Sequence, residues 1–259
     1  MHWIIQNNIF SETGWDQLLE TIDRFGLSHS VHKVVPFIGE LEPPAVVDHG
    51  NVICIGSYSM RHVAKRNGWI PGVFDLFEQD FEQQLKHWGE HMLNASSVIS
   101  SFAEAVFTEE LMFIRPTNDS KYFAGRVFSR EEFETWQKKV CDLKLDDGSS
   151  LTPQTLIQVM KPIAIYCEAR FWVVKGRIIT KSIYKRGDRV IYSSEVDDSF
   201  TKYVEERIQE WQPHDAFVID VCDTELGLKI VEINTLNSSG FYAGDVQKLV
   251  LALEEAFSL

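Results

Sequence analysis

Two apolar runs near the end of the chain most constrain what it can fold into. They cover residues 216–222 and 228–234, and the Asp-Thr-Glu-Leu-Gly segment between them favours a turn. Both runs are rich in Val and Ile, so they predict two strands that fold back on each other as a hairpin. Because few polar residues interrupt these runs, the positions of the polar residues carry information about function.

Three of those polar residues have oxygen atoms that meet on one face of the predicted hairpin. Glu232 and Asn234 are two residues apart and share a face, and Asp220 lies on the partner strand. Two carboxylates and an amide carbonyl suit Mg²⁺, a hard cation that keeps waters and shares phosphate ligands. Polar groups among Val, Ile and Cys are costly unless something pairs with them. The alternative is that these residues end a strand at the surface, with Asn234 starting a turn.

The first third of the chain alternates short apolar runs with helical patterns. Residues 15–25 and 59–69 have helical spacing, and a longer helical stretch is expected over residues 81–104. Strands are expected at residues 32–38 and 51–57. Alternation of this kind is typical of a small α/β domain with a parallel sheet.

The later part of the chain has an antiparallel pattern. Residues 168–185 predict a hairpin that turns at Lys175 and Gly176. We therefore expect an α+β chain with two domains, a small α/β domain at residues 1–105 and a hairpin-rich domain at residues 106–259.

The composition limits the classes of partner. The 259 residues include 25 Lys and Arg against 38 Asp and Glu, which gives a net charge of −13. Non-specific nucleic-acid binding depends on basic patches, so no nucleic-acid partner is expected. The chain shows neither an apolar run of about 18 residues nor a secretory signal pattern, so we expect a cytoplasmic protein without a membrane partner. None of the four cysteines has metal-ligand spacing, and no disulfide is expected.

Other familiar site patterns are weak or missing. His87 and His91 match a short zinc-peptidase pattern, but Gly89 weakens the helix and no third ligand is apparent. The chain has no Walker A sequence and no Gly-x-Gly-x-x-Gly, which disfavours a P-loop or Rossmann nucleotide site. Gly56 and Ser57, at the end of an expected strand, either bind substrate or form an ordinary turn.

An acidic strand residue followed by Glu-x-Asn at the end of the next strand resembles the C-terminal metal site of ATP-grasp enzymes. The order of features agrees over residues 105–259, and the chain is similar to a bacterial and phage clade named for two arginines and one lysine at its nucleotide site. The family usually has Lys in the strand where this chain has Phe-Ile-Arg-Pro. The resemblance implies that Arg115 binds phosphate and that Lys121, in the following loop, approaches the phosphates as well.

The resemblance extends to the segment Leu-Ile-Gln-Val-Met-Lys-Pro, which matches the strand running into the adenine-binding hinge. It implies that backbone groups of Val159 and Met160 face the adenine. Gln158 or Lys161 is then expected to lie beside the same ring.

The next segment resembles the family's acid-x-Arg pair, whose arginine reaches the triphosphate. Here that pair is Glu168 and Arg170, and either Lys181 or Lys185 supplies a further cation near the transferred phosphate or the substrate. Independently of any family, a triphosphate needs several cations and a metal, because phosphoryl transfer is catalysed mainly by positioning and charge neutralisation. For each cation taken singly, the alternative is a solvated surface charge.

The resemblance as a whole implies an ATP-grasp fold preceded by a small pre-ATP-grasp domain, and an ATP-dependent ligase. Such enzymes activate a carboxylate as an acylphosphate with ATP and Mg²⁺, and an amine or other nucleophile then displaces phosphate. Substrates are expected among small-molecule or peptide carboxylates and amines. Mg²⁺ is assigned to Asp220, Glu232 and Asn234, and charge neutralisation to Arg115, Lys121, Arg170 and Lys181. Two alternatives remain: a nucleotide-binding module without activity, and a kinase-like phosphotransferase on the same fold.

Overall fold

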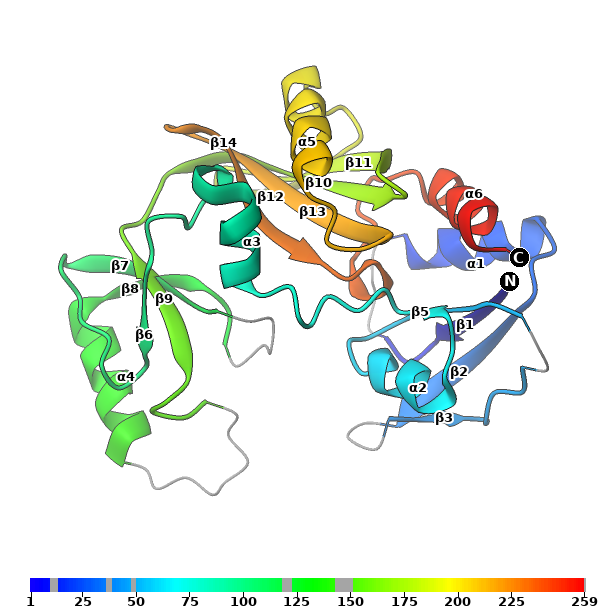
Figure 1. Ribbon diagram of the computed structural model, residues 1–259, viewed down its shortest axis with the longest axis horizontal. Coiled ribbons are helices and arrows are strands. Elements are labelled where there is room, and N and C mark those ends of the chain that lie inside the picture. The colour runs from blue at the N-terminus through cyan, green and yellow to red at the C-terminus, as the bar shows by residue number, and fades with distance from the viewer. Residues whose placement is uncertain (10–13, 36–38, 48–49, 118–122, 143–150, 259) are drawn as a thin grey trace. The chain divides into compact units, whose positions relative to one another are not determined.

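Among the described residues, the strands form three sheets (Figure 1). The computed structural model describes residues 1–9, 14–35, 39–47, 50–117, 123–142 and 151–258. The chain divides into two compact units, one made of residues 1–76 with 165–259 and the other of residues 77–164. Two sheets belong to the first unit and the third sheet belongs to the second unit.

The amino-terminal sheet has the order β3-β2-β1-β4-β5, with β3 antiparallel and the other strands parallel. Its strands are β1 (His2–Gln6), β2 (His29–Val35), β3 (Glu40–Glu42), β4 (Val52–Ile55) and β5 (Pro71–Gly72). Its helices are α1 (Trp15–Arg24) and α2 (Met60–Asn67). Trp3 of β1 lies in one core with Leu18 of α1. The next residue of β1, Ile4, lies in another core with Val63 of α2. Because neighbouring strand residues point to opposite faces, the two helices cover opposite faces of the sheet, as the alternating pattern predicted.

The second sheet of this unit is antiparallel, with the order β12-β11-β10-β13-β14. Its strands are β10 (Ile165–Val174), β11 (Arg177–Arg186), β12 (Arg189–Ser193), β13 (Ala216–Thr224) and β14 (Gly227–Asn234). Its helices are α5 (Asp198–Glu210), η2 (Leu236–Ser238) and α6 (Val246–Phe257). The predicted hairpin turn is confirmed, because Lys175 and Gly176 both have positive φ angles, 48° and 72°. Trp172 of β10 and Leu249 of α6 lie in the same core as Trp3, so this sheet packs with the amino-terminal sheet.

The sheet of the second unit has the order β6-β9-β7-β8 and is antiparallel. Its elements are α3 (Phe81–Trp88), η1 (Gly89–His91), β6 (Val98–Ser101), β7 (Leu111–Pro116), β8 (Arg126–Ser129), α4 (Arg130–Asp142) and β9 (Leu156–Met160). A reciprocal pair of hydrogen bonds between Ser129 and Glu132 starts α4. The core of the second unit includes Phe102, Ile114 and Phe133. Because Phe133 belongs to α4, this core joins α4 to the sheet.

The structure corrects one predicted helix and divides the chain differently from the sequence pattern. The helix expected over residues 81–104 ends at Trp88, because Gly89 takes a positive φ of 49° and a strand follows at Val98. The compact units separate near residues 76 and 164 rather than near residue 105, since the two sheets of the first unit share one core. The division into a domain at residues 1–105 and a domain at residues 106–259 stays a prediction.

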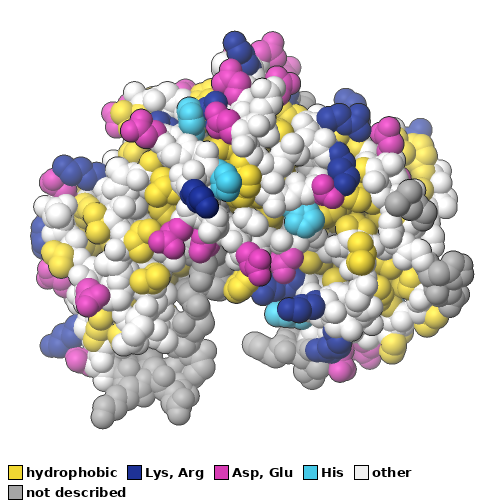
Figure 2. Space-filling model, in the orientation of Figure 1, with side chains coloured by type: hydrophobic (Ala, Val, Ile, Leu, Met, Phe, Trp, Pro, Cys, Tyr) yellow, Lys and Arg dark blue, Asp and Glu magenta, His cyan; other side chains and the backbone are white. Residues whose placement is uncertain are grey.

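Surface and cysteine features are compatible with the composition. On the face shown in Figure 2, Lys and Arg side chains are interspersed with Asp and Glu. Within the described ranges, no helix is both long enough and apolar enough to cross a membrane. All four cysteines are free, and Cys54, Cys167 and Cys222 are buried.

A histidine on β1 gives the fold a predicted sensitivity to acid. His2 contacts the hydroxyl groups of Ser28 through Nδ1 (2.7 Å) and of Ser30 through Nε2 (2.9 Å). Burial lowers the pKa of His2, and the neighbouring His29 and His32 lower it further. Because the folded-state pKa lies below the unfolded value of about 6.5, the folded protein binds fewer protons than the unfolded chain. The stability contribution is therefore present above about pH 6.5 and is lost as the pH falls.

Urea unfolding at about pH 7.5 and about pH 5.5 measures this contribution. We expect His2→Gln, which keeps hydrogen-bonding groups but does not titrate, to lose less stability on acidification than the parent protein. An equal loss in the two proteins would show that His2 plays no part in the acid sensitivity.

Candidate active site

Pairing between three neighbouring strands aligns polar side chains in one row. Arg170 on β10 pairs with Asp220 on β13, and Asp220 pairs with Glu232 on β14. Asn234 follows Glu232 by two residues and shares its face. The pairing shifts between Asp220 and Val221, so a bulge lies beside Glu232, and such bulges re-aim side chains at sites. The three side chains expected to converge are therefore brought together.

The amide of Asn234 lies between the two carboxylates. Its Nδ2 donates to Asp220 Oδ2 and to Glu232 Oε1, at 3.2 Å in each case. In the described part of the chain, no three His, Cys, Asp or Glu side chains are grouped so as to hold a metal. A cation here therefore depends on two carboxylates, the amide carbonyl and ligands from outside the protein. This donor set fits Mg²⁺, which commonly takes one or two carboxylates together with substrate phosphates.

Arg170 and Asp220 form a buried ion pair with two parallel hydrogen bonds. Arg170 Nε donates to Asp220 Oδ1 at 2.8 Å, and Nη2 donates to Oδ2 at 2.7 Å. Burial, reinforced by the Glu232 and Glu168 carboxylates, raises the pKa of Asp220, while the Arg170 guanidinium opposes this shift. Burial opposes the charged form of Arg170, but Asp220 more than compensates and raises the pKa of the guanidinium. A planar guanidinium fork of this kind also matches the geometry of phosphate oxygens.

Glu168 holds two further groups next to this pair. Tyr184 donates from Oη to Glu168 Oε2 at 2.8 Å, and Lys185 Nζ lies 3.0 Å from Glu168 Oε1. Burial raises the pKa of Tyr184, and the Asp220 and Glu168 carboxylates raise it further, so the tyrosine stays a neutral donor. The sequence pattern does not single out Tyr184. A signal is nevertheless present in the strand that follows the acid-x-Arg segment. Ser182 pairs with Arg170, and Tyr184 comes two residues after Ser182 on the same strand.

Tyr242 covers Arg170 from the loop after β14. The Arg170 guanidinium carbon lies 4.8 Å from the centroid of the Tyr242 ring, a cation–π contact. The same ring stacks on Tyr184 and Tyr192, with centroid distances of 5.2 and 5.0 Å. Tyr242 has a φ of 50°, a conformation that costs backbone energy and is concentrated at functional sites. The sequence pattern does not indicate this residue either.

The two candidate lysines on β11 have different surroundings. Lys181 pairs with Phe171, the neighbour of Arg170 on β10, so its side chain leaves the opposite face of the sheet. There its Nζ donates to Thr201 of α5 at 2.6 Å. Lys185 instead reaches Glu168. The structure does not bring Lys181 to the Arg170 cluster, and it favours Lys185 as the additional cation.

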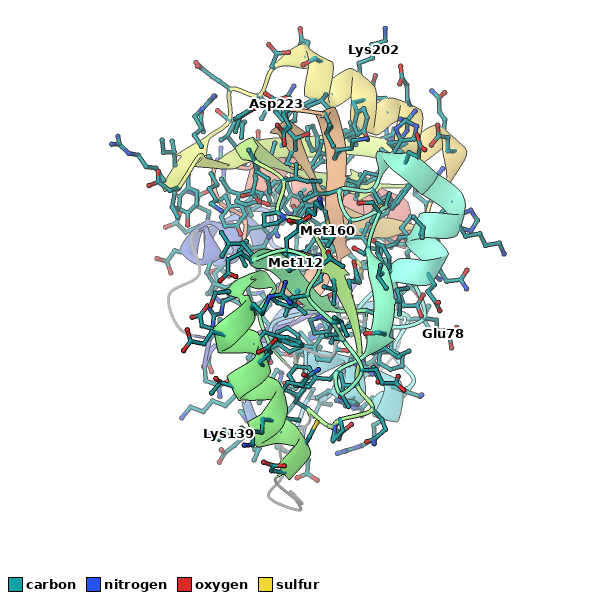
Figure 3. All side chains as sticks on the ribbon, turned by 90° about the vertical axis from the view of Figure 1, so that its left-hand side faces the viewer. Glu78, Met112, Lys139, Met160, Lys202 and Asp223 are labelled. Carbon is teal, nitrogen blue, oxygen red and sulfur yellow. The ribbon has the colours of Figure 1, made fainter. Side chains whose placement is uncertain are left out.

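Strands β7 and β9 of the second unit carry most of the residues expected to meet the nucleotide. Arg115 pairs with Gln158 and Phe113 pairs with Met160, so these four side chains share one face of the sheet. Figure 3 shows Met160 on this sheet. Gln158 donates from Nε2 to the Pro116 carbonyl at 3.2 Å, but its buried Oε1 meets no donor among the described residues. A buried acceptor of this kind fits a position where a ligand supplies the donor.

Two other predicted nucleotide residues have different surroundings, and a third is not described. Val159 pairs with Ile114, and both side chains belong to the core of the second unit, which leaves Val159 only its backbone for a ligand. Lys161 Nζ forms an exposed ion pair with Glu109 Oε1 at 2.6 Å. Lys121 lies outside the described residues.

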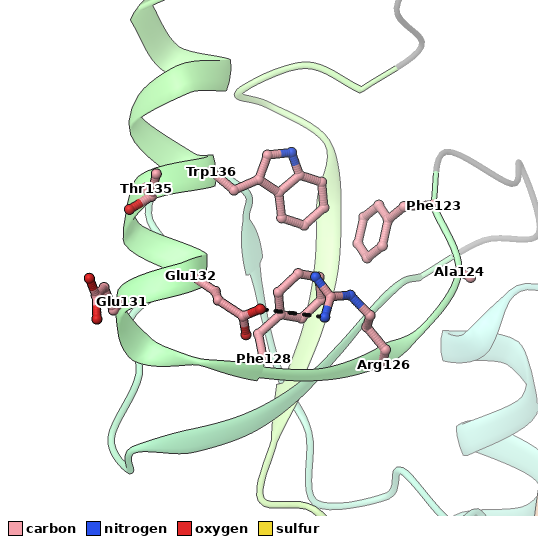
Figure 4. A pocket seen from close by; sticks show the side chains of 8 residues that line it. All are labelled: Phe123, Ala124, Arg126, Phe128, Glu131, Glu132, Thr135 and Trp136. Atoms are coloured by element: carbon pink, nitrogen blue, oxygen red, sulfur yellow. Dashed lines mark ion pairs between the residues drawn. The ribbon is translucent and has the colours of Figure 1, made fainter.

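A separate hollow of about 660 Å³ lies on the second unit between α4 and β8 (Figure 4). Its aromatic wall contains Trp136, which meets Phe123 edge-to-face and stacks on Phe128. The guanidinium carbon of Arg126 lies 3.7 Å from the centroid of the Phe128 ring, and its Nη1 lies 3.8 Å from Glu132 Oε1. Among the described residues, those predicted to bind nucleotide or metal do not line this hollow, which is therefore distinct from the Arg170 and Asp220 cluster.

Comparison with solved structures identifies similar folds at low sequence identity. D-alanine–D-alanine ligase from Bacillus anthracis complexed with ATP has a TM-score of 0.65 and 10% identity, covering 98% of this chain and 96% of that chain. D-cycloserine synthetase DcsG has a TM-score of 0.64 and 11% identity, covering 98% of this chain and 99% of that chain. L-amino acid ligase from Bacillus licheniformis has a TM-score of 0.63 and 12% identity, covering 97% of this chain and 74% of that chain. These likenesses confirm the predicted fold.

Sequence comparison supplies the family. A search among curated proteins finds no match. The family model that matches describes an ATP-grasp domain, family 3 of the clade named for two arginines and one lysine, and it covers residues 47–253, which is most of the chain. The resemblance inferred from the late hairpin and the acid-x-Arg segment is thereby confirmed, and the chain belongs to family 3 of this two-arginine, one-lysine clade of ATP-grasp proteins.

Proposed function

We propose that this protein is an ATP-dependent ligase that joins a carboxylate to an amine or related nucleophile through an acylphosphate. One observation carries the proposal. In a chain of the ATP-grasp family, Asp220, Glu232, Asn234 and Arg170 form one contact cluster on three adjacent strands. This cluster joins an oxygen donor set suited to Mg²⁺ with a guanidinium fork suited to phosphate. The ligase names of the similar structures support the same reaction class.

The proposed reaction has two steps. An oxygen of the substrate carboxylate attacks the γ-phosphorus of ATP, and ADP leaves with the electrons of the broken phosphoanhydride bond. The amine nitrogen then attacks the carbonyl carbon of the acylphosphate, inorganic phosphate leaves, and the nitrogen loses a proton. Both steps move negative charge between oxygens, so the protein contributes mainly by positioning and by charge neutralisation.

The residues of the first unit divide these tasks. When bound, Mg²⁺ neutralises phosphate charge, and Asp220, Glu232 and Asn234 are the residues proposed to hold it. Arg170 is proposed to bind phosphate oxygens through its fork, and Lys185 to add a cation beside Glu168. Tyr184 and Tyr242 do not react; they hold Glu168 and Arg170 in place.

The residues of the second unit are proposed as nucleotide ligands. Arg115 is assigned to phosphate, and Gln158 to the nucleotide through its unpaired Oε1. The backbone groups of Val159 and Met160 are assigned to adenine. Lys121 and Lys161 keep the nucleotide-binding roles that the family resemblance implies.

For the substrate, we propose the carboxyl ends of β1 and β4. Ligands of α/β sheets bind at this edge, where the strand order reverses direction. Gln6 Oε1 accepts hydrogen bonds from Ser57 N and Oγ, both at 2.8 Å, and the Asn237 carbonyl accepts from Gly56 N at 2.8 Å. The buried Nδ2 of Asn237 meets no acceptor within the described part of the chain. It therefore offers a donor to a carboxylate or carbonyl group of the substrate.

Product analysis with ATP, Mg²⁺ and pairs of amino acids or short peptides tests the proposed function. We expect ADP and phosphate release that requires both partners, with a product whose mass is the sum of the two substrates minus one water. A phosphorylated product without a new amide would favour the phosphotransferase alternative. Nucleotide binding without turnover, for every pair tried, would favour a binding module and contradict the ligase.

A further inference from the structure

Hydrogen-bond donors occupy most of the Asp220 carboxylate. Arg170 donates to both of its oxygens, at 2.8 and 2.7 Å, and Asn234 Nδ2 donates to Oδ2 at 3.2 Å. A carboxylate has about four acceptor positions, so three donors leave one position, on Oδ1. Because Asp220 is almost completely buried, water does not provide a substitute for a lost donor. A divalent cation that binds Asp220 therefore competes with donors of the protein itself.

The amide of Asn234 is oriented against metal ligation. Its NH₂ group points at Asp220 and Glu232, and only its carbonyl oxygen is able to ligate a cation. Two negative acceptors favour the orientation that presents the NH₂ group, and a cation between them favours the reverse. A metal bound by these three residues therefore requires the amide to turn over.

We infer that Arg170 and Asn234 are internal donors that a divalent cation must displace from Asp220 and Glu232, so that metal and nucleotide bind cooperatively. This inference rests on the proposed function and deepens it. Phosphate oxygens of a nucleotide offer Arg170 a second acceptor, and they add oxygen ligands for the metal. Coupling of this kind acts equally on both ligands and typically changes affinity about 5–150-fold.

The surroundings of Arg170 suit such an exchange. Within the described residues, the hydrogen bond that Arg170 donates besides those to Asp220 is long, with Nη1 at 3.5 Å from the Gly240 carbonyl. The Tyr242 ring, 4.8 Å from the guanidinium carbon, attracts the positive charge without prescribing a hydrogen-bond direction. The guanidinium is therefore able to share or shift its hydrogen bonds while it stays over the ring. Lys185 differs, because its Nζ contacts Glu168 rather than Asp220.

Binding of Mn²⁺ alone, followed by the EPR signal of the free ion, tests the competition without nucleotide or turnover. We expect Arg170→Met to bind Mn²⁺ at least about tenfold more tightly than the parent protein, because Asp220 loses its competitor. Lys185→Met removes the same charge from the neighbouring carboxylate, and we expect a clearly smaller gain. In an Asp220→Asn background, Arg170→Met should give no gain over Asp220→Asn alone, which locates the effect at Asp220.

Two outcomes overturn the inference: no tighter binding in Arg170→Met, or equal gains in Arg170→Met and Lys185→Met. Circular dichroism checks that each variant is folded. If Arg170→Met is not folded, Arg170→Lys replaces it, because lysine keeps the charge but cannot form the fork. A gain smaller than tenfold is then expected, and an unchanged affinity overturns the inference. The proposed ligase activity is judged separately by product formation, so either idea can fail while the other survives.

Discussion

Arg170→Met is expected to lower the free energy of unfolding by about 3–5 kcal/mol. The side chains of Arg170 and Asp220 are only 9% and 2% exposed, so the substitution leaves a buried carboxylate without its partner. The expected cost comes mainly from that unpaired charge and less from the strength of the ion pair itself. Urea unfolding followed by circular dichroism at neutral pH measures the change.

Two comparisons separate this effect from a general loss of charge. Lys175→Met removes an ion pair to Asp215 whose side chains are 44% and 58% exposed, and we expect a loss of at most about 1 kcal/mol. Arg170→Met/Asp220→Asn removes both buried charges and should recover much of the lost stability. If Arg170→Met were no more harmful than Lys175→Met, the buried ion pair would not have the role that its geometry indicates.

Glu232→Gln is expected to reduce kcat/KM for ATP-dependent turnover by about 100-fold or more, as when one charge-stabilising group is removed from other active sites. The substitution keeps the shape of the side chain and an oxygen able to accept from Asn234, which lies 3.2 Å away. It removes one of the two carboxylates available to Mg²⁺, so phosphate charge is less well neutralised. Steady-state release of ADP across a range of Mg²⁺ concentrations measures the effect, and excess Mg²⁺ should restore part of the rate.

The same hairpin offers a matched control. Glu225 lies in the turn between β13 and β14 and is exposed. Glu225→Gln removes an equal charge within the same element, and we expect no more than about a twofold change, as for surface substitutions generally. Equal activity of parent and Glu232→Gln would remove Glu232 from the metal site.

The late hairpin shows why part of the site could be predicted from the sequence. Alternation in residues 228–234 placed Glu232 and Asn234 on one face, and the short turn brought the strand of Asp220 beside them. The structure has this arrangement. The strands and the shared face of Glu232 and Asn234 follow from a period of two residues and one local turn. The pairing of Asp220 with Glu232 also needs the register shift beside Glu232, because regular pairing from the turn would set Asp220 opposite Val231.

Features that depend on irregular register or on distant packing could not be predicted in this way. The choice between Lys181 and Lys185 turns on a register shift between Glu168 and Ala169, which simple alternation does not reveal. Tyr242 contacts Arg170 from a loop and itself has a positive φ, a conformation that the sequence does not predict for an aromatic residue. The compact units follow a core shared by residues far apart in sequence, so local composition gave a different boundary.

A crystal structure with Mg²⁺ and a non-hydrolysable ATP analogue tests whether Asp220, Glu232 and Asn234 hold the metal of a bound nucleotide. We expect a cation about 2.0–2.1 Å from oxygens of Asp220, Glu232 and Asn234, with the Asn234 carbonyl turned toward it. We also expect the Arg170 guanidinium to contact phosphate. A cation and triphosphate bound elsewhere, with Asp220 and Glu232 contacting neither, would contradict the assignment.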